Sequence, residues 1–599
     1  MNKSAILHIP MSEYAYGTDE EHVTIRLRAA HGDLTKVTLF YGDRACRKTP
    51  VDFTEVPMRK VMECELYDYF EAILEKPYHR LNYYFEITDG QESLLYYGDC
   101  FCKEPVDDRS EYYQLPMNHR ADIVTPPDWA QDAVIYNIFP DSFASGRRYI
   151  SHEAREIVYE GKTVRGKLGG NLKGITENAD YLQDLGVNAI YINPIFVAGE
   201  YHKYDLLDYF HVDPVFGRDE DLKTLVKEYH SRGIRVIIDG VFNHCGWNFF
   251  AFEDVVVNGE QSAYKDWFYQ LSFPVVRPDD PEDYPNYECF GYERMMPKLN
   301  MANPETADYF VRVGEYWVKE FDIDGWRLDV ASEVNDTFWL RFHAAVKAVK
   351  PDAILIGEVW ETANHWLDGK IFDSAMNYDF RKHCKRFFAE ESIDATEFGN
   401  RTANMYMRYR RQTTFAQLNV LDSHDVSRFL SVCDEREERY RLALIFQMTF
   451  PGMPSIFYGD EMGIRGVLEA DYRKPMIWEQ ENEENGANGA NGIDVSRSPD
   501  SPDEQNLYQF FKKLIQLRKN ETCLRRGDFR ILQAEHDSLF IYERKTSNGE
   551  CIRVALNAGP DEKKLKVDSS SGHMLLQSGY KSEKLGAYGY LIQKMDELR

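Results

Sequence analysis

Three acidic residues end short segments in the middle of the chain, two of which are mostly apolar. Asp329 ends Gly-Trp-Arg-Leu-Asp, Glu358 ends Leu-Ile-Gly-Glu, and Asp425 ends Leu-Asp-Ser-His-Asp. Carboxyls that share a cleft can divide acid and base work. One is protonated near neutral pH and gives its proton to a leaving oxygen, while another is ionised and attacks or stabilises an oxocarbenium-like carbon. These acids therefore indicate glycoside hydrolysis.

Cationic and imidazole side chains accompany the acids. Arg327 stands two residues before Asp329 on the same strand face, where it can keep that carboxylate ionised and oriented. This favours Asp329 as nucleophile and leaves Glu358 as acid/base. Each residue alone also has a structural interpretation, since strand-end Asp residues cap helices and buried histidines are usually satisfied core groups. It is their joint occurrence that favours a catalytic site.

The elements that must position these residues are short strands alternating with helical patterns, such as those at 222–232 and 306–320. This alternation predicts an α/β fold, a (β/α)8 TIM barrel with its functional groups at the carboxyl ends of the strands. Asp329 and Glu358 are 29 residues apart, which fits one βα unit, so the acids should share one mouth. Eight strands are predicted, at 133–139, 189–193, 236–239, 325–329, 354–358, 373–377, 416–421 and 454–458.

Changes in the pattern of apolar and polar residues along the chain predict three domains. Residues 1–125 alternate like the strands of an N-terminal β-sandwich, 126–525 carry the catalytic barrel, and 526–599 return to strand-like runs that predict a C-terminal β-domain. The irregular stretch at about 245–300 predicts a small subdomain inserted after strand 3. The Asn/Gly/Glu-rich tract within 479–505 predicts a surface loop.

Composition narrows the range of partners. The 599 residues carry a net charge of −28, which disfavours nucleic acid and anionic membranes and is compatible with a neutral ligand. The start of the chain lacks the apolar run of a secretory leader, and no later stretch is long enough to span a membrane, so a cytoplasmic protein is expected. The ten cysteines form no C-x-x-C pair, which fits reduced thiols better than disulfides or zinc.

Four segments resemble the signature regions of the α-amylase superfamily of retaining glycosidases (glycoside hydrolase family 13). They are Asp239-Gly-Val-Phe-Asn-His244, Gly325-Trp-Arg-Leu-Asp329, Gly357-Glu-Val-Trp360 and Leu421-Asp-Ser-His-Asp425. Met296-Pro-Lys-Leu-Asn300 resembles the fingerprint of the neopullulanase, cyclomaltodextrinase and maltogenic amylase subfamily. Further segments similar to that group are His202-Lys-Tyr-Asp205, Asp208-Tyr209, Tyr136-Asn-Ile-Phe-Pro140 and Tyr458-Gly-Asp-Glu461.

The resemblance implies a role for each matching residue. Asp329 would be the nucleophile, Glu358 the acid/base, and Asp425 a third carboxylate that binds sugar hydroxyls. Tyr204 would stack on the sugar at the non-reducing side of the cut, and Phe290 on the leaving-group side, where a core role is an equal alternative. The substrate-binding residues that the resemblance implies are His202, Tyr204, Asp239, Asn243, His244, Phe290, Arg327, Glu333, Trp360 and His424.

The resemblance also bears on ligands and assembly. Some relatives hold a structural calcium, but Arg147 and Asn171 stand where acidic ligands are wanted, so no metal or other cofactor is expected. Cyclodextrins, malto-oligosaccharides or pullulan, cut at α-1,4 bonds, are the implied substrates, and a homodimer is the implied assembly. The alternatives are an oligo-1,6-glucosidase, a glucan transglycosylase and, more remotely, a catalytically inactive glucan-binding scaffold.

Overall fold

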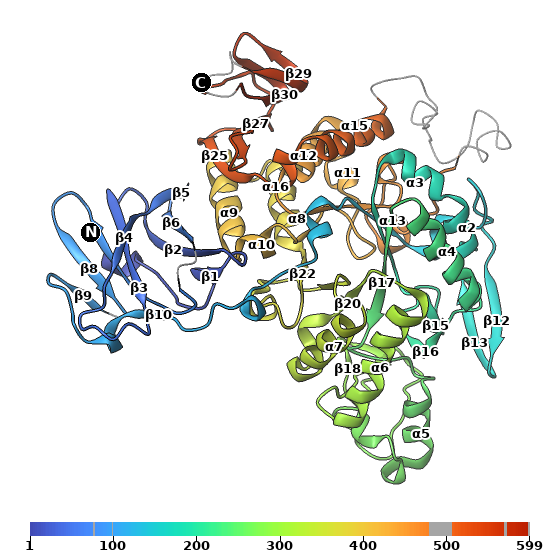
Figure 1. Cartoon of the computed structure of the whole chain (residues 1–599). Coiled ribbons are helices and arrows are strands. Elements are labelled where there is room, and N and C mark those ends of the chain that lie inside the picture. Colours follow the sequence, from blue (N-terminus) through green and yellow to red (C-terminus); the bar gives the residue numbers. More distant parts are fainter. Residues whose placement is uncertain (76–77, 99, 479–505, 568–571, 597–599) are drawn as a thin grey trace.

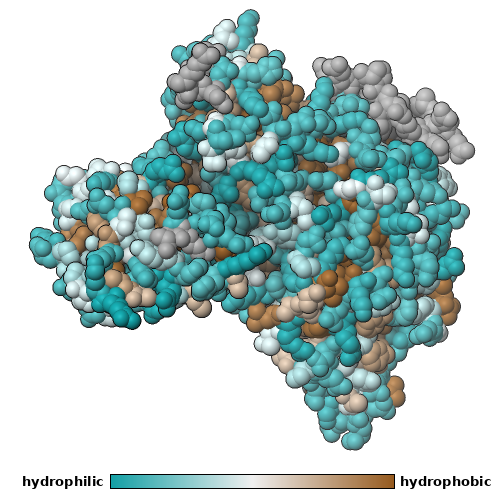
Figure 2. All heavy atoms as spheres, in the orientation of Figure 1, coloured by the Kyte–Doolittle hydropathy of each residue, from teal (hydrophilic) through white to brown (hydrophobic). Residues whose placement is uncertain are grey.

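The computed structural model describes residues 1–75, 78–98, 100–478, 506–567 and 572–596. A barrel forms the centre of the molecule, with one β-rich domain on the left of Figure 1 and another at the top. The predicted loop at 479–505 lies outside the described residues. None of the helices in the described ranges is both long and apolar enough to cross a membrane. The face seen in Figure 2 is mostly hydrophilic.

Eight parallel strands close the barrel in chain order, and β11 pairs with both β14 and β24. All eight coincide with the strands that the sequence predicts. Side chains alternate along each strand: Ile237 belongs to the cluster inside the barrel, whereas Val236 and Ile238 pack outward in the main core. The strands are β11 (Ile135–Ile138), β14 (Ala189–Ile192), β17 (Arg235–Val241), β20 (Gly325–Asp329), β21 (Ile354–Gly357), β22 (Ser374–Asn377), β23 (Leu418–Val420) and β24 (Met453–Phe457).

Helices cover the outside of the barrel. The longest helix among the described residues, α6, begins with Pro304 after Asn303, whose side chain accepts hydrogen bonds from two free backbone N–H groups of the first turn. The helices are α1 (Pro140–Phe143), α2 (Leu172–Glu177), α3 (Ala179–Leu185), α4 (Asp219–Ser231), α5 (Phe250–Asn258), α6 (Pro304–Phe321), α7 (Asp336–Val349), α8 (Tyr378–Cys384), α9 (Ala395–Met407), α10 (Arg411–Thr414), α11 (Phe429–Val432), α12 (Glu437–Thr449), α13 (Glu469–Tyr472), α15 (Leu507–Asn520) and α16 (Thr522–Arg526).

In the part of the chain that the structure describes, three hairpins extend from the barrel. The insertion after β17 contains α5 and the hairpin of β18 (Cys289–Phe290) and β19 (Glu293–Pro297), within the range in which the sequence predicts a subdomain. Two other hairpins were not predicted. They are β12 (Arg155–Tyr159) with β13 (Lys162–Gly166), and β15 (Phe196–Ala198) with β16 (Leu206–Val212). The second of these presents the loop that carries His202 and Tyr204.

Two sheets at the N-terminal end pack face to face around their own core, which is the predicted β-sandwich. This domain sits against α9 and α10, where Arg26 donates to the carbonyl of Tyr409 at 3.0 Å and Asn400 bonds with Glu65. One sheet contains β1 (Ala15–Gly17), β2 (His22–Ala30), β6 (Tyr67–Glu75) and β5 (Arg59–Glu63). The other contains β4 (Thr54–Pro57), β3 (Lys36–Asp43), β7 (Leu81–Thr88), β8 (Ser93–Tyr97), β9 (Cys100–Cys102) and β10 (Tyr113–Leu115).

An antiparallel sheet forms the C-terminal domain. Arg544 is fully buried where this sheet meets α12 and α16, and it donates to the carbonyls of Leu524 at 2.7 Å and Gly527 at 2.6 Å. Those carbonyls lie near helix ends, where backbone acceptors lack helical partners. The strands are β25 (Asp528–Ala534), β26 (Leu539–Lys545), β27 (Cys551–Asn557), β28 (Lys563–Lys564), β29 (His573–Lys581) and β30 (Lys584–Lys594).

A buried carboxyl lies at the seam where the last barrel strand meets the first. Glu461, in the turn after β24, accepts hydrogen bonds from the hydroxyls of Tyr136 at 2.7 Å and Tyr181 at 2.6 Å. Burial raises the pKa of Glu461 to about 7. Because this folded-state pKa lies above the unfolded value of 4.5, the folded state holds the proton more tightly. The associated stability is present below pH 4.5 and is lost as pH rises through about 7.

We therefore expect Glu461→Gln, which keeps an oxygen acceptor for both hydroxyls, to reduce the fall in Tm between pH 5 and pH 8. The free-energy difference involved is at most about 3 kcal/mol. Differential scanning calorimetry at pH 5 and pH 8 measures the fall in Tm. Glu320→Gln, on the exposed face of α6, is the matched control and should keep the full slope. An unchanged slope in Glu461→Gln would contradict this assignment.

Candidate active site

The three carboxylates meet at the carboxyl end of the barrel. Asp329 is the last residue of β20, Glu358 directly follows β21, and Asp425 lies in the loop after β23. All three line one cavity of about 700 Å³. This is the shared mouth that the strand spacing predicts.

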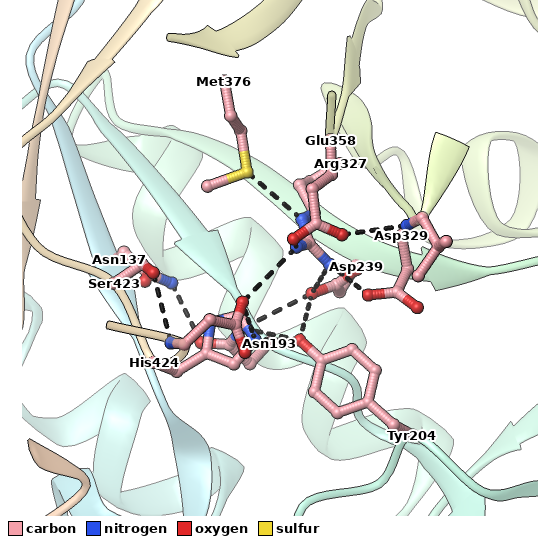
Figure 3. A network of polar contacts seen from close by, with 12 residues as sticks. Asn137, Asn193, Tyr204, Asp239, Arg327, Asp329, Glu358, Met376, Ser423 and His424 are labelled. Carbon is pink, nitrogen blue, oxygen red and sulfur yellow. Dashed lines mark hydrogen bonds and ion pairs between the residues drawn. The ribbon is translucent and has the colours of Figure 1, made fainter. Parts of the chain in front are cut away.

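Arg327 connects the acids (Figure 3). Its Nη1 donates to Asp329 Oδ1 at 2.7 Å and to Asp239 Oδ1 at 2.9 Å, and its Nη2 forms an ion pair with Glu358 Oε1 at 2.8 Å. Nε donates to the sulfur of Met376 at 3.4 Å. The guanidinium is completely buried, so water cannot weaken these contacts. Asp329 and Glu358 are thereby held at neighbouring nitrogens of one rigid, planar group.

Burial is the main electrostatic influence on two of the acids. It raises the pKa of Asp329 well above the ordinary value, with repulsion from Glu358 adding to it and the Arg327 guanidinium opposing it. The pKa of Asp425 is raised to about 7, again first by burial and then by Glu358. Repulsion between like charges is thus the smaller influence, because desolvation in the folded cleft contributes more.

Glu358 is fixed by further hydrogen bonds. Its Oε2 accepts from the backbone N–H of Val330 at 2.9 Å, and its Oε1 from the indole N–H of Trp360 at 3.2 Å. Val330 has a φ of 44°, which is costly for a β-branched residue and directs its N–H at the carboxylate. Local backbone strain thus accompanies the placement of Glu358.

Neutral polar groups lie beside the acids, and His424 Nε2 is 3.1 Å from Asp425 Oδ2. Tyr204 donates to Asp239 at 2.8 Å, and its ring lies nearly parallel to that of His424, with centroids 5.3 Å apart. Burial lowers the pKa of His202 and of His244 to about 3, and lowers that of His424 well below its usual range. The three imidazoles are therefore uncharged at neutral pH. Such groups suit hydrogen bonding to an uncharged, hydroxyl-bearing ligand.

Two aromatic side chains, Trp360 and Phe290, also line the cavity. Trp360 is half exposed and stacks on Tyr378, with ring centroids 3.8 Å apart and planes 7° apart. Phe290 stacks on His244 at 5.0 Å and lines the cavity, so it does not belong to the buried core. Both present apolar faces beside the carboxylates.

The structure separates the predicted site residues into two layers. Nine of them line the cavity: Asp329, Glu358, Asp425, His202, Tyr204, His244, Phe290, Glu333 and Trp360. The other four are buried behind this lining and contact it: Asp239, Asn243, Arg327 and His424. Asn243 illustrates the difference, because its Oδ1 accepts from Lys298, whose ammonium also contacts Glu333 Oε2 at 3.2 Å.

Sequence reasoning missed several members of the site. Asn193 donates to Nδ1 of His424 at 3.0 Å. It is a polar residue at the end of a correctly predicted strand, and this position could have identified it as a site candidate. Arg473 lies after the last barrel strand, where no motif points to it. Its Nε donates to the carbonyl of His424 at 2.8 Å, and its Nη2 lies 3.6 Å from Asp425 Oδ1. Other unpredicted lining residues are Glu293, Met296, Val330, Ser332, Glu361 and Glu469.

A closed (β/α)8 barrel with carboxylates gathered around a buried arginine at its mouth defines a class of barrel glycoside hydrolases. Residues 137–527 match the model of the alpha amylase catalytic domain, and residues 1–119 match that of the alpha amylase N-terminal ig-like domain. The chain therefore belongs to the α-amylase family of glycoside hydrolases.

Similar proteins align over almost the entire chain. A cyclomaltodextrinase of Geobacillus thermopakistaniensis is 42% identical, covering 93% of this chain and 91% of its own length. Neopullulanase 2 of Thermoactinomyces vulgaris is 38% identical, with 98% and 97% covered, and an intracellular maltogenic amylase of Bacillus subtilis strain 168 is 39% identical, with 93% and 92% covered. A solved cyclomaltodextrinase structure, 35% identical, superimposes with a TM-score of 0.87 and full coverage of both chains.

Proposed function

We propose that this protein hydrolyses α-1,4-glucosidic bonds of cyclodextrins, malto-oligosaccharides or pullulan with retention of the anomeric configuration. The observation that carries the proposal is the attachment of Asp329 and Glu358 to the two terminal nitrogens of Arg327 at the barrel mouth. The names of the similar proteins, cyclomaltodextrinase, neopullulanase and maltogenic amylase, support this range of substrates.

The first half of the proposed reaction breaks the glycosidic bond. Asp329 Oδ attacks the anomeric carbon and forms a glycosyl ester, while the bond from that carbon to the leaving oxygen breaks. Protonated Glu358 transfers its proton to this oxygen. The Arg327 guanidinium, 2.7 Å from the Asp329 carboxylate, favours its ionised form and so opposes the effect of burial on its pKa.

The second half releases the sugar. A water molecule gives a proton to Glu358 as its oxygen attacks the anomeric carbon, and Asp329 leaves as a carboxylate. Two inversions at one carbon restore the α-configuration. In this proposal Asp425 and the neutral imidazoles of His202 and His244 bind sugar hydroxyls, Tyr204 stacks on the sugar, and the buried Asp239 and Asn243 hold these groups in place.

Product analysis tests this function. Purified protein is incubated side by side with β-cyclodextrin, pullulan and starch, and chromatography follows the products. NMR of the first products should show the α-anomer. Initial formation of the β-anomer would contradict the retaining mechanism, and failure to cut any of the three glucans would contradict the proposed substrates.

We propose that catalysis and stability need no calcium. Asn171 caps α2 by accepting from Gly174 N–H at 2.8 Å, while its amide nitrogen faces backbone carbonyls. Arg147 pairs with Asp180 at 2.7 Å. A guanidinium and an amide nitrogen do not suit an oxygen-seeking cation. Across the described residues no group of three His, Cys, Asp or Glu side chains could hold a metal.

Chelation should accordingly leave the protein unaffected. We expect EDTA to change neither the Tm nor the rate on β-cyclodextrin, compared with a sample given excess Ca²⁺. Calorimetry and reducing-sugar release measure the two quantities. A loss of several degrees on chelation that Ca²⁺ reverses would show that a calcium site exists elsewhere in the chain.

We propose a cytoplasmic homodimer in which the N-terminal sandwich of one subunit lies over the cleft of the other. The relative from Bacillus subtilis is named intracellular. Within the described part of the chain, all cavity-lining residues fall between His202 and Arg473, so the subunit's own sandwich does not line its cleft. Twofold dimers are also the commonest oligomers.

Dilution distinguishes this assembly from a monomer with a glucan-binding module. As dimers dissociate, the specific activity on β-cyclodextrin should fall, while activity on starch should fall less or rise because the cleft becomes more open. Sedimentation velocity at the same concentrations reports the oligomeric state. A monomer at all concentrations with unchanged substrate preference would contradict the proposal.

A further inference from the structure

Two tyrosines of the inserted subdomain are more exposed than almost all other large apolar side chains that the structure describes. Tyr292 is 84% exposed and Tyr284 is 76% exposed. Their ring centroids lie 6.1 Å apart with planes at 81°, an edge-to-face contact. Leaving two large rings in water forgoes their burial, so their position on this acidic, mostly polar chain needs an explanation.

The hairpin of β18 and β19 places Tyr292 at the rim of the cavity, and the contact between the two rings brings Tyr284 to the same rim. Phe290 and Glu293 face each other across the hairpin, and both line the cavity. Only Gly291 and Tyr292 lie between them. Gly291 has a φ of 54°, which a tight turn requires and which suits glycine. A turn whose two flanking residues both line a cavity must itself stand at the edge of that cavity.

The surroundings of the pair exclude many ligands. Glu293 directly follows Tyr292, and the stretch 279–283 before Tyr284 reads Asp-Asp-Pro-Glu-Asp. These carboxylates repel anionic ligands at neutral pH. Aromatic rings beside acidic side chains suit an uncharged ligand that offers C–H groups to the ring and hydroxyls to the carboxylates. A pyranose ring has both kinds of surface.

We propose that Tyr284 and Tyr292 form an accessory binding platform for linear α-glucans, contacting the part of a long chain that extends outside the cavity beyond Phe290. This inference rests on the proposed function, because that function supplies the ligand class. The platform lets a long glucan gain binding energy that a short one cannot reach. It therefore selects for chain length without taking part in bond cleavage.

In the proposed dimer the partner's sandwich also lies over the cleft, so a second copy of this chain is the other candidate occupant of the rim, and the acidic surroundings of the two rings favour the glucan. A stable protein interface buries about 1,200 Å² or more in total, with apolar contacts at its centre. Here two rings stand close to acidic residues. That surface matches a sugar better than an interface core.

Binding to a protein that does not turn over tests the platform directly. In an Asp329→Asn background, isothermal titration calorimetry measures the Kd of maltotriose and of maltodecaose. Tyr284→Ala with Tyr292→Ala should weaken maltodecaose binding by about three- to tenfold, the range expected for lost ring contacts, and leave maltotriose unchanged. Tyr292→Phe should retain the affinity for maltodecaose. Tyr149→Ala, at a 45% exposed tyrosine outside the hairpin, is the matched control.

The outcomes separate this inference from the proposed function. Equal loss of affinity for both sugars, or no loss for either, overturns the platform. A change in sedimentation coefficient in the double variant without a change in maltodecaose affinity also overturns it and points to a second copy. Failure of the unmodified protein to hydrolyse glucans contradicts the proposed function, but a selective loss of maltodecaose affinity would still establish the platform.

Discussion

Asp329→Asn should lower kcat by at least about 10⁴-fold, because the amide cannot form the glycosyl ester on which the reaction depends. The fold should persist. Burial disfavours the charged form of Asp329, and a neutral amide of the same shape is cheaper to bury, while Arg327 keeps its contacts with Asp239 and Glu358. Initial rates on β-cyclodextrin and the Tm measure the two effects.

Two control variants for Asp329 test whether residual activity comes from deamidation and whether any change of a carboxylate to an amide lowers activity. Asp329→Ala cannot deamidate back to aspartate and should be equally inactive, whereas Asp308→Asn, an exposed carboxylate paired with Arg341, should be fully active. Added azide should react with an α-glucosyl fluoride in Asp329→Ala to give the inverted β-glycosyl azide, because a small anion can occupy the vacated space. Substantial hydrolysis by both Asp329 variants would contradict the nucleophile assignment.

Glu358→Gln should reduce activity on natural glucans by a comparable factor, since the leaving oxygen receives no proton. For aryl glucosides with acidic leaving groups, the rate of glycosyl-ester formation should fall much less, because these groups depart without protonation. Release of the leaving group should then show a burst, because the ester forms but water attacks it without a general base. Stopped-flow absorbance with a nitrophenyl glucoside measures the burst.

Azide distinguishes the role of Glu358 from that of Asp329. In Glu358→Gln it should attack the glycosyl ester without needing a base, so the product should be the retained α-glycosyl azide. Glu320→Gln, remote from the cavity, should behave as the unmodified protein. If Glu358→Gln loses activity equally on good and poor leaving groups and shows no burst, Glu358 is not the acid/base.

Much of the architecture follows from local sequence pattern. The eight barrel strands were predicted because buried parallel strands read as short apolar runs between helical patterns. The hairpin β12–β13 was missed because its strands mix polar and apolar side chains, and β15–β16 was missed because β15 is an apolar run of only three residues. Contacts with neighbouring segments help to hold these hairpins in place. One such contact joins Arg165 of β13 to Glu200 at 3.0 Å.

For the site, the sequence by itself determined which carboxylates occur at strand ends and that they share one mouth, because a parallel barrel brings the carboxyl ends of all its strands to one face. Only the tertiary structure decided which of these residues line the cavity and which are buried behind it. Asp239 and Asn243 became buried supports, and Arg473, far along the chain and without a motif, came to lie beside Asp425. Burial depends on packing between segments distant in sequence, so neither these positions nor the raised pKa of Asp425 follows from local pattern.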